Sequence, residues 1–324
     1  MAPRKQFVHL TATHPLVKEL KSGKHEWWNT LVERSHKDPE INIQVRGDYL
    51  SVYNRMGSLL EIRLKNKKVV CRTHYKYLIA SRRKEEEYVD VNPSGKDLTV
   101  DLKSCDLVTS ILEKENFDRI KSNIARLAGE EKSIQSKLVE KNRNTLLDVE
   151  IAFSESGTLI DPEEDDASSS RKTRSRSTRI DLVNYDKNLN ALVFIELKQI
   201  FDGRLYSDSK GRKEVNKQIE KYKLFAKNHA EELIKTYNDV IEVKKELGLL
   251  PKGSALWSAK IESVEPKPIL AIAGYKQDII NARRGKVEED LDTGNLVALY
   301  FFGPPIDLTL PRKKDKNKVL FPKD

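Results

Sequence analysis

The sequence has little cysteine and no long apolar run, and each absence removes a class of protein. Its 324 residues include two cysteines, Cys71 and Cys105, which are too few for a disulfide framework. Cys71 and His74 have a ligand-like spacing, but no second Cys/His pair completes a zinc site. No run of about 18 apolar residues is present to span a bilayer, and no apolar segment of a secretory signal follows the basic N-terminus. We therefore expect a cytoplasmic protein with no membrane contact.

Charge, in contrast, is abundant and unevenly distributed. Charged residues make up 34% of the chain beside 38% hydrophobic residues, and 59 Lys and Arg oppose 50 Asp and Glu, for a net charge of +9. Residues 1–144 carry 28 basic and 20 acidic residues, whereas residues 145–324 carry 31 and 30. This composition is typical of a globular protein, and the excess of positive charge in the first part favours a polyanionic partner.

The pattern of short β segments near the N-terminus predicts a first domain over residues 1–112, since a chain of this length favours two domains. A helix is expected around residues 25–34. Turn residues then separate apolar β segments in the manner of an antiparallel meander. The expected strands are residues 41–45, 49–53, 59–64 and 69–71, with the Tyr75-Lys76-Tyr77 run after them. Much of the positive charge lies here, so we predict a basic domain of α+β type.

The pattern becomes helical from Phe117 onward, which places a second domain over residues 113–324. Its apolar stripe, at steps of three, four and seven, includes Glu131 and is interrupted by Gly129. The elements expected next are a strand at 146–153, strands at 179–185 and 191–198 around a turn at 186–190, a helix at 213–237 extended to about 247, a strand at 268–275, a short helix at 277–284 and a strand at 295–302. The acid-rich then basic segment 155–178 is expected to be a mobile loop, and the basic tail from Arg312 to be frayed.

Three charged residues at the ends of two apolar strands predict a metal-assisted active site. Period-2 geometry puts Glu196 and Lys198 on one face of the second strand, and the hairpin turn brings Asp181 within reach of Glu196. Charges that end an apolar strand are costly to bury unless they are paired or bound to a metal. Two carboxylates beside a lysine can hold Mg²⁺ and place an ammonium near a phosphate that is being hydrolysed.

Three further residues are predicted to contribute to this site. Glu131, on an otherwise apolar helical stripe, is a candidate third carboxylate. Gln218 and Tyr222 are four residues apart on the helix after the lysine strand and therefore share one face. From that face they can hydrogen-bond a phosphate or a metal-bound water.

Together these residues resemble the PD-(D/E)xK nuclease superfamily, which has the restriction-endonuclease-like fold. The resemblance covers roughly residues 115–302 and rests on Asp181, the Glu196-Leu197-Lys198 triplet and the order helix-strand-strand-strand-helix-strand. The segment from Gln218 to Tyr222 is similar to the QxxxY motif of the RecB-like and lambda-exonuclease-like branch. Ile180 stands where the family often has proline, and the loop at 155–178 is unusually long. The resemblance implies an α/β core with a central mixed sheet flanked by helices (αβββαβ).

The resemblance also implies the role of each matching residue. Asp181, Glu196 and the Leu197 carbonyl would bind the metal, with Glu131 as the helix glutamate. Lys198 would be the catalytic lysine, and Gln218 and Tyr222 the accessory motif. Magnesium is the expected cofactor, with Mn²⁺ as an alternative.

The expected function is therefore hydrolysis of phosphodiester bonds by a metal-dependent nuclease, in DNA rather than RNA. By family analogy it would act in defence against foreign DNA or in DNA repair. The N-terminal domain would bind nucleic acid or a partner protein. Two alternatives remain: a catalytically silent nucleic-acid-binding or assembly subunit, and a nuclease switched on by a partner or signal through the N-terminal domain.

Each residue type also has a plainer interpretation. An aspartate followed by Glu-x-Lys occurs by chance in charged proteins as a surface salt bridge, and Glu131 can face solvent, with Glu140 as its reserve. Glu150 alternates out of the apolar face of its strand, which favours a structural or solvated role. Trp27 and Trp28 favour a core position. The basic residues between Arg63 and Lys84 can form an ordinary solvated face; they are Arg63, Lys65, Lys67, Lys68, Arg72, Lys76, Arg82, Arg83 and Lys84.

Overall fold

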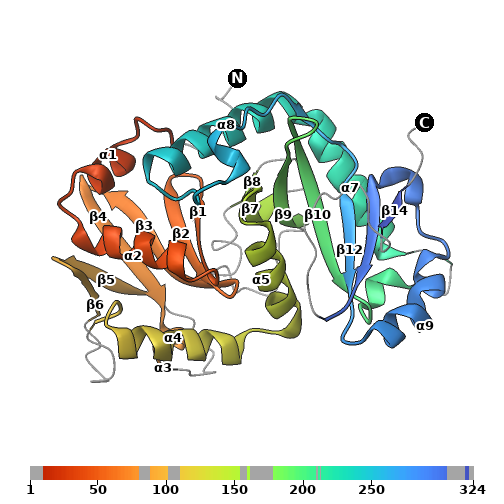
Figure 1. Cartoon of the computed structure of the whole chain (residues 1–324), viewed down its shortest axis with the longest axis horizontal. Helices are drawn as coiled ribbons and strands as arrows, with labels where there is room; N and C mark the ends of the chain where they lie inside the picture. Colours follow the sequence, from red (N-terminus) through yellow and green to blue (C-terminus); the bar gives the residue numbers. More distant parts are fainter. Residues whose placement is uncertain are drawn as a thin grey trace, which may run out of the picture. The chain divides into compact units, whose positions relative to one another are not determined.

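The computed structural model shows mixed α/β architecture with two β-sheets (Figure 1). It describes residues 10–79, 88–100, 110–153, 159–160, 178–208, 211, 213–304 and 318–320. Most of the predicted loop 155–178, most of the tail from Arg312, and Arg82, Arg83 and Lys84 lie outside these residues. No helix within the described ranges is long and apolar enough to cross a bilayer.

The chain forms two compact units, and each unit is built from more than one segment of the sequence. The N-terminal unit comprises Val8–Ser136 and Asp239–Gly253, and the C-terminal unit is built from the described residues within Lys137–Asn238 and Ser254–Asp324. The domain boundary expected from the sequence, at 112/113, stays a prediction.

The N-terminal unit contains a six-stranded sheet in which each described strand pairs with the next along the chain. Its elements are α1 (Pro15–Lys21), α2 (Glu26–Lys37), β1 (Ile41–Val45), β2 (Tyr49–Asn54), β3 (Gly57–Lys65), β4 (Lys68–His74), α3 (Tyr75–Ile79), β5 (Tyr88–Ser94), β6 (Asp97–Thr99) and α4 (Lys114–Leu127). The strands pair antiparallel, which confirms the predicted meander. Trp27 and Trp28 are buried, as their apolar bulk predicts.

The prediction that the Tyr75-Lys76-Tyr77 run belongs to the β segments is wrong. The run forms α3, and His74 Nδ1 accepts the Lys76 N–H at 3.3 Å at the start of this helix. This local bond competes with the β ladder, so the aromatic content of the run did not decide its structure.

The C-terminal unit is organised around an eight-stranded mixed sheet of order β14-β13-β12-β10-β9-β7-β8, with β11 beside β10. Its strands are β7 (Leu146–Phe153), β8 (Leu159–Ile160), β9 (Thr178–Asp186), β10 (Ala191–Gln199), β11 (Ser263–Val264), β12 (Ile269–Ala273), β13 (Ala298–Phe302) and β14 (Lys318–Leu320). β9 and β10 form an antiparallel hairpin, and β12 and β13 continue parallel to β10. The predicted strands at 146–153, 179–185 and 191–198 are confirmed.

Two short strands lie where the sequence indicated irregular structure. β8 falls inside the predicted loop 155–178 and pairs with β7, and β14 falls inside the tail that was expected to fray and pairs with β13. Both pair with an edge of the sheet, where exposed N–H and C=O groups accept a short partner strand. Two or three residues carry too little pattern for such a strand to be seen in the sequence.

The helices break where the local sequence weakens them. The helical stripe from Phe117 is divided into α4 and α5 (Glu130–Asn142) around Gly129, as predicted. The long helix expected from Lys213 is divided at His229 into α7 (Glu214–Asn228) and α8 (Ala230–Glu246). The remaining helical segments are α9 (Gln277–Glu288) and the 3₁₀ turns η1 (Gly203–Leu205), η2 (Ala255–Trp257) and η3 (Thr293–Asn295).

An apolar core holds α7 and α9 against the sheet of the C-terminal unit. Val215 and Ile219 of α7 are fully buried with Leu270 and Ile272 of β12 and with Ile280 of α9. Val215, Ile219, Tyr222 and Ala226 are spaced at steps of three and four, so one face of α7 meets the sheet. Gln218 and Tyr222 are thereby directed toward β10.

Candidate active site

Asp181 and Glu196 lie opposite each other on neighbouring strands. The β9–β10 ladder ends at the pair Leu182 and Ile195, and one step further along this register are Asp181 and Glu196. At this point the Leu197 N–H donates to Asp181 Oδ2 at 2.7 Å, so a side-chain carboxylate takes the place of a backbone carbonyl as the acceptor. Opposite residues of an antiparallel pair share one face of the sheet, so the hairpin brings both carboxylates to the same face, as its turn predicted.

Lys198 is paired with Glu196 inside the protein. Its ammonium donates to Glu196 Oε1 and, at 3.2 Å, to the Leu197 carbonyl oxygen. The side chains of Lys198 and Glu196 are 2% and 1% exposed. Removing water opposes the charge on the lysine, but the Glu196 and Asp181 carboxylates outweigh that effect and raise the pKa of Lys198. The lysine therefore stays protonated at neutral pH.

The two carboxylates are held in an environment that disfavours their charge. Desolvation raises the pKa of Asp181 well above its usual value, and the charges of Glu196 and Glu150 add to the increase. Desolvation also raises the pKa of Glu196, against the opposing effect of Lys198. Burial and a neighbouring carboxylate thus oppose ionisation of Asp181, whereas Lys198 counteracts the effect of burial on Glu196.

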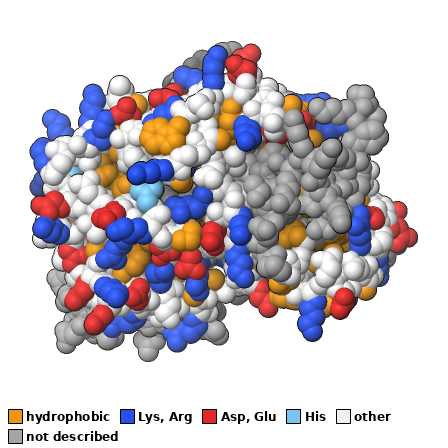
Figure 2. All heavy atoms as spheres, viewed as in Figure 1, with side chains coloured by type: hydrophobic (Ala, Val, Ile, Leu, Met, Phe, Trp, Pro, Cys, Tyr) orange, Lys and Arg blue, Asp and Glu red, His pale blue; other side chains and the backbone are white. Residues whose placement is uncertain are grey.

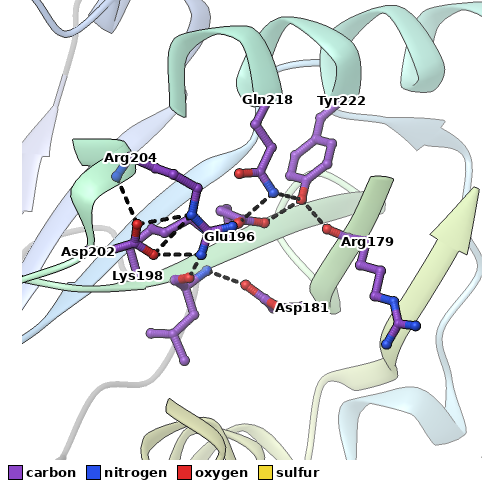
Figure 3. A network of polar contacts seen from close by, with 9 residues as sticks. Arg179, Asp181, Glu196, Lys198, Asp202, Arg204, Gln218 and Tyr222 are labelled. Atoms are coloured by element: carbon purple, nitrogen blue, oxygen red, sulfur yellow. Dashed lines mark hydrogen bonds and ion pairs between the residues drawn. The ribbon is translucent and has the colours of Figure 1, made fainter. Parts of the chain in front are cut away.

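Gln218 and Tyr222 reach from α7 to Glu196 (Figure 3). Gln218 Nε2 donates to Glu196 Oε1 and to the Tyr222 hydroxyl oxygen, both at 2.7 Å. The Tyr222 hydroxyl meets Glu196 Oε2 and the Arg179 carbonyl oxygen, and its one proton serves one of these acceptors at a time. Tyr222 is fully buried, and desolvation followed by the Glu196 charge raises its pKa well above the usual value. Both oxygens of Glu196 are therefore fixed in place.

Two of the other glutamates considered from the sequence, Glu131 and Glu150, have different positions. Glu131 lies in the first turn of α5, in the part of that helix that belongs to the N-terminal unit, so its place in the site stays a prediction. Glu150 lies on β7 between the residues paired with Leu182 and Ile180, and its charge acts on Asp181. Within the described ranges, no three His, Cys, Asp or Glu side chains are grouped closely enough to hold a metal ion.

The strand that carries Glu150 departs from the alternation expected of it. The register shifts between Leu146 and Asp148, and Glu150 has a positive φ of 52°. As a result Leu147, Asp148 and Val149 are all buried in succession. The buried Asp148 is hydrogen-bonded by Tyr237 at 3.3 Å. Such an irregularity re-aims side chains and is common beside functional sites.

Sequence reasoning missed an ion pair next to the site. Asp202 and Arg204 follow β10, and the Arg204 guanidinium holds Asp202 through Nε at 2.9 Å and Nη2 at 2.6 Å. Burial opposes the Asp202 charge, yet Arg204 and Lys198 lower the pKa of Asp202. The Arg204 charge also acts on Glu196 and Lys198. The Asp-x-Arg pattern, which begins four residues after Lys198, was a signal that the sequence offered.

The basic residues of the N-terminal unit are partly neutralised. Arg63 and Arg72 both pair with Glu61, which is 1% exposed, and Arg72 also lies over the Tyr88 ring at 4.5 Å. Lys65, Lys67 and Lys68 are exposed around the β3–β4 turn. On the face drawn in Figure 2, the described Lys and Arg side chains lie among Asp and Glu side chains rather than in one continuous patch. Nucleic-acid binding by this unit stays a prediction.

Comparison of the chain with protein-family models, with curated proteins and with solved structures found no match. The function must therefore be argued from the geometry.

Proposed function

We propose that this protein is a metal-dependent nuclease that hydrolyses phosphodiester bonds, in DNA rather than RNA. The observation that carries the proposal is the buried pair of Glu196 and Lys198 beside the partly buried Asp181. In this group α7 hydrogen-bonds both oxygens of Glu196. The order α5, β7, β9, β10, α7, β12, with the short strands β8 and β11, the helix α8 and two 3₁₀ turns between them, supports a restriction-endonuclease-like core of the kind implied by the sequence resemblance.

The donor set suits a hard divalent cation. Asp181 and Glu196 share one face, and the charge of Glu196 makes Asp181 harder to ionise, a conflict that a bound Mg²⁺ or Mn²⁺ would relieve. In this proposal Asp181, Glu196 and the Leu197 carbonyl would hold the ion, and Glu131 or Glu150 would add a further carboxylate. A bound cation would supply a Lewis acid for the phosphate and acidify a water molecule.

Each side chain has a distinct task in the proposed reaction. Lys198 remains protonated, so it would donate hydrogen bonds to a phosphate oxygen and would not serve as a base. Gln218 and Tyr222 would keep the Glu196 carboxylate in one orientation, which preserves ligand geometry. Two neighbouring carboxylates beside a buried ammonium favour catalysis over a purely binding role, because a binding surface has no need of them.

The test is a nuclease assay of the purified full-length chain on linear duplex, plasmid and single-stranded DNA and on RNA, with Mg²⁺, Mn²⁺ or EDTA. We expect divalent-cation-dependent cleavage, which Lys198→Ala and Asp181→Ala should each abolish without loss of the folded state. Lys227→Ala, an exposed lysine on α7, is the matched control and should cleave normally. The proposal is wrong if every substrate stays intact, or if Lys198→Ala cleaves as fast as the control.

A further inference from the structure

Two exposed aromatic side chains stack on one another directly beyond the strand that carries Glu196 and Lys198. Phe201 is 45% exposed and Tyr275 is 41% exposed. Their ring centroids lie 6.3 Å apart, and the angle between the ring planes is 28°. The parallel pairing of β10 with β12 explains the contact. Gln199 pairs with Ala273, so Phe201 and Tyr275 each lie two residues past the end of matching strands.

An arginine of α9 completes this surface, which we call the aromatic platform: Phe201, Tyr275, Tyr206 and Arg283. The Arg283 guanidinium lies 4.4 Å from the centre of the Phe201 ring and donates to the Tyr206 hydroxyl at 3.3 Å. Arg283 is exposed and has no carboxylate partner among the residues that the structure describes. Its neighbour Arg284, by contrast, is paired with Glu288. The platform therefore combines flat apolar rings with a positive charge that no carboxylate of the described residues neutralises.

The platform is close to the candidate active site. Phe201 follows Lys198 by three residues, a separation of at most about 10 Å along the chain. That length corresponds to no more than about three nucleotides, because each nucleotide rises by roughly 3.4 Å along a duplex and an unpaired strand is at least as extended. The turn between them is firm, since Ile200 N–H donates to the Ala273 carbonyl at 2.7 Å and Asp202 N–H to the Gln199 carbonyl at 2.8 Å.

Single exposed apolar residues are common on protein surfaces and need no explanation. A stacked aromatic pair beside an exposed arginine is different, because it offers the two interactions that bind single-stranded nucleic acid. Aromatic rings stack on bases of any type, and basic side chains neutralise phosphates. A protein partner's apolar side chain would make less use of the arginine, so the charge favours a polyanion.

We propose that the aromatic platform binds an unpaired nucleobase of the strand that is cut, within about three nucleotides of the scissile phosphate, while Arg283 contacts a neighbouring phosphate. This inference rests on the proposed nuclease function. It specifies the substrate class, because bases inside a duplex are already stacked on one another and present no free face. The preferred substrate is then single-stranded DNA, or duplex DNA with an unpaired end at the site of cleavage.

The experiment measures binding of the full-length protein in EDTA, which separates recognition from cleavage. The probes are a fluorescently labelled DNA hairpin with a five-nucleotide single-stranded overhang, on either end, and the same hairpin with a blunt end. The variants are Phe201→Ala, Tyr275→Ala, their combination, and Phe201→Trp, which retains a stacking ring. The control is Leu189→Ala, which removes a side chain of 48% exposure from the turn at the opposite end of β10.

We expect Phe201→Ala and Tyr275→Ala each to weaken binding of an overhang probe by roughly 5- to 150-fold, the factor that corresponds to about 1–3 kcal/mol per stacked base. Phe201→Trp and Leu189→Ala should bind like the unaltered protein, and the blunt probe should not respond. In a series of overhang probes, each with an abasic site at a different position, one position should give weaker binding than the others. That difference between positions should disappear in the double alanine variant.

Two results would overturn the inference: alanine variants that bind the overhang as tightly as the control, or an equal loss on blunt and overhang probes. Thermal melting of each variant shows that the fold is intact. Failure of the platform is distinguishable from failure of the nuclease proposal. If the protein cleaves DNA but the alanine variants bind the overhang normally, only the platform inference is wrong. If the platform binds bases but no substrate is cleaved, only the nuclease proposal is wrong.

Discussion

Gln218 Nε2 lies 2.7 Å from Glu196 Oε1, and this bond ties the middle of α7 to the central strand of the sheet. It also joins the accessory pair to the carboxylate that the lysine contacts. α7 therefore acts on the candidate site through Glu196.

The first prediction concerns Tyr222. Tyr222→Phe removes the hydroxyl that meets Glu196 and the Arg179 carbonyl, and should weaken Mn²⁺ affinity and slow cleavage by about 10- to 100-fold, as loss of a group that orients a ligand does. Calorimetric titration with Mn²⁺ and single-turnover cleavage rates measure both. Tyr237→Phe is the matched control, because Tyr237 is equally buried and its hydroxyl bonds Asp148 instead. Equal effects of the two changes would show that Tyr222 has only a structural role.

The second prediction concerns the stability of the metal-free protein. Because the folded pKa of Asp181 is raised above its unfolded value of 3.8, the folded state binds more protons, and stability falls as pH rises above that value. Asp181→Asn keeps an acceptor for the Leu197 N–H and removes this charge. Its melting temperature in EDTA should therefore exceed that of the wild type, by an amount that grows from pH 4 to pH 8. A variant that is less stable than wild type at pH 8 would contradict this.

The third prediction concerns the packing that holds α7. Ile219→Ala empties a fully buried position beside Gln218 and should lower the free energy of unfolding by about 2–5 kcal/mol. Leu224→Ala on the same helix should change it by less than about 0.5 kcal/mol, since Leu224 is 52% exposed. Denaturant unfolding measures both. A similar loss in the two variants would mean that α7 is not held by this core.

The fourth prediction concerns two glycines near the aromatic platform. A Cβ on Gly274 would lie 2.6 Å from Ile280 Cγ1, so Gly274→Ala should lower stability by about 1–3 kcal/mol as α9 is pushed away. A Cβ on Gly285, inside α9, would meet nothing within 4 Å, so Gly285→Ala should raise stability by about 0.5–1 kcal/mol. Differential scanning calorimetry distinguishes the two signs, and a shift of the same sign in both variants would refute the argument.

The relation between Asp181 and Glu196 was predictable because a hairpin turn sets the register of two strands. Once the turn at residues 186–190 was recognised, period-2 geometry decided which side chains share a face. The common face of Gln218 and Tyr222 followed from helical geometry in the same way. These relations are local in sequence, and both appear in the structure.

The remaining features depend on contacts between distant segments or on irregular backbone. The neighbouring positions of Phe201 and Tyr275 require the register of β10 against β12, across 74 residues. The influence of Glu150 on Asp181 requires a register shift and a positive φ, which regular alternation does not foresee. The helix α3 was missed because a histidine side chain supplies its first hydrogen bond.

The N-terminal unit is built from two chain segments that are far apart in the sequence. This separation affects when the unit can fold during synthesis on the ribosome. Its sheet is complete by residue 99, but Gln44 hydrogen-bonds Lys244 at 3.0 Å and His36 bonds the Gly248 carbonyl at 2.7 Å. These partners leave the ribosome about 200 residues after the strands they contact. On the growing chain, Gln44 therefore lacks its Lys244 partner until the segment that carries Asp181, Glu196 and Lys198 has already been synthesised.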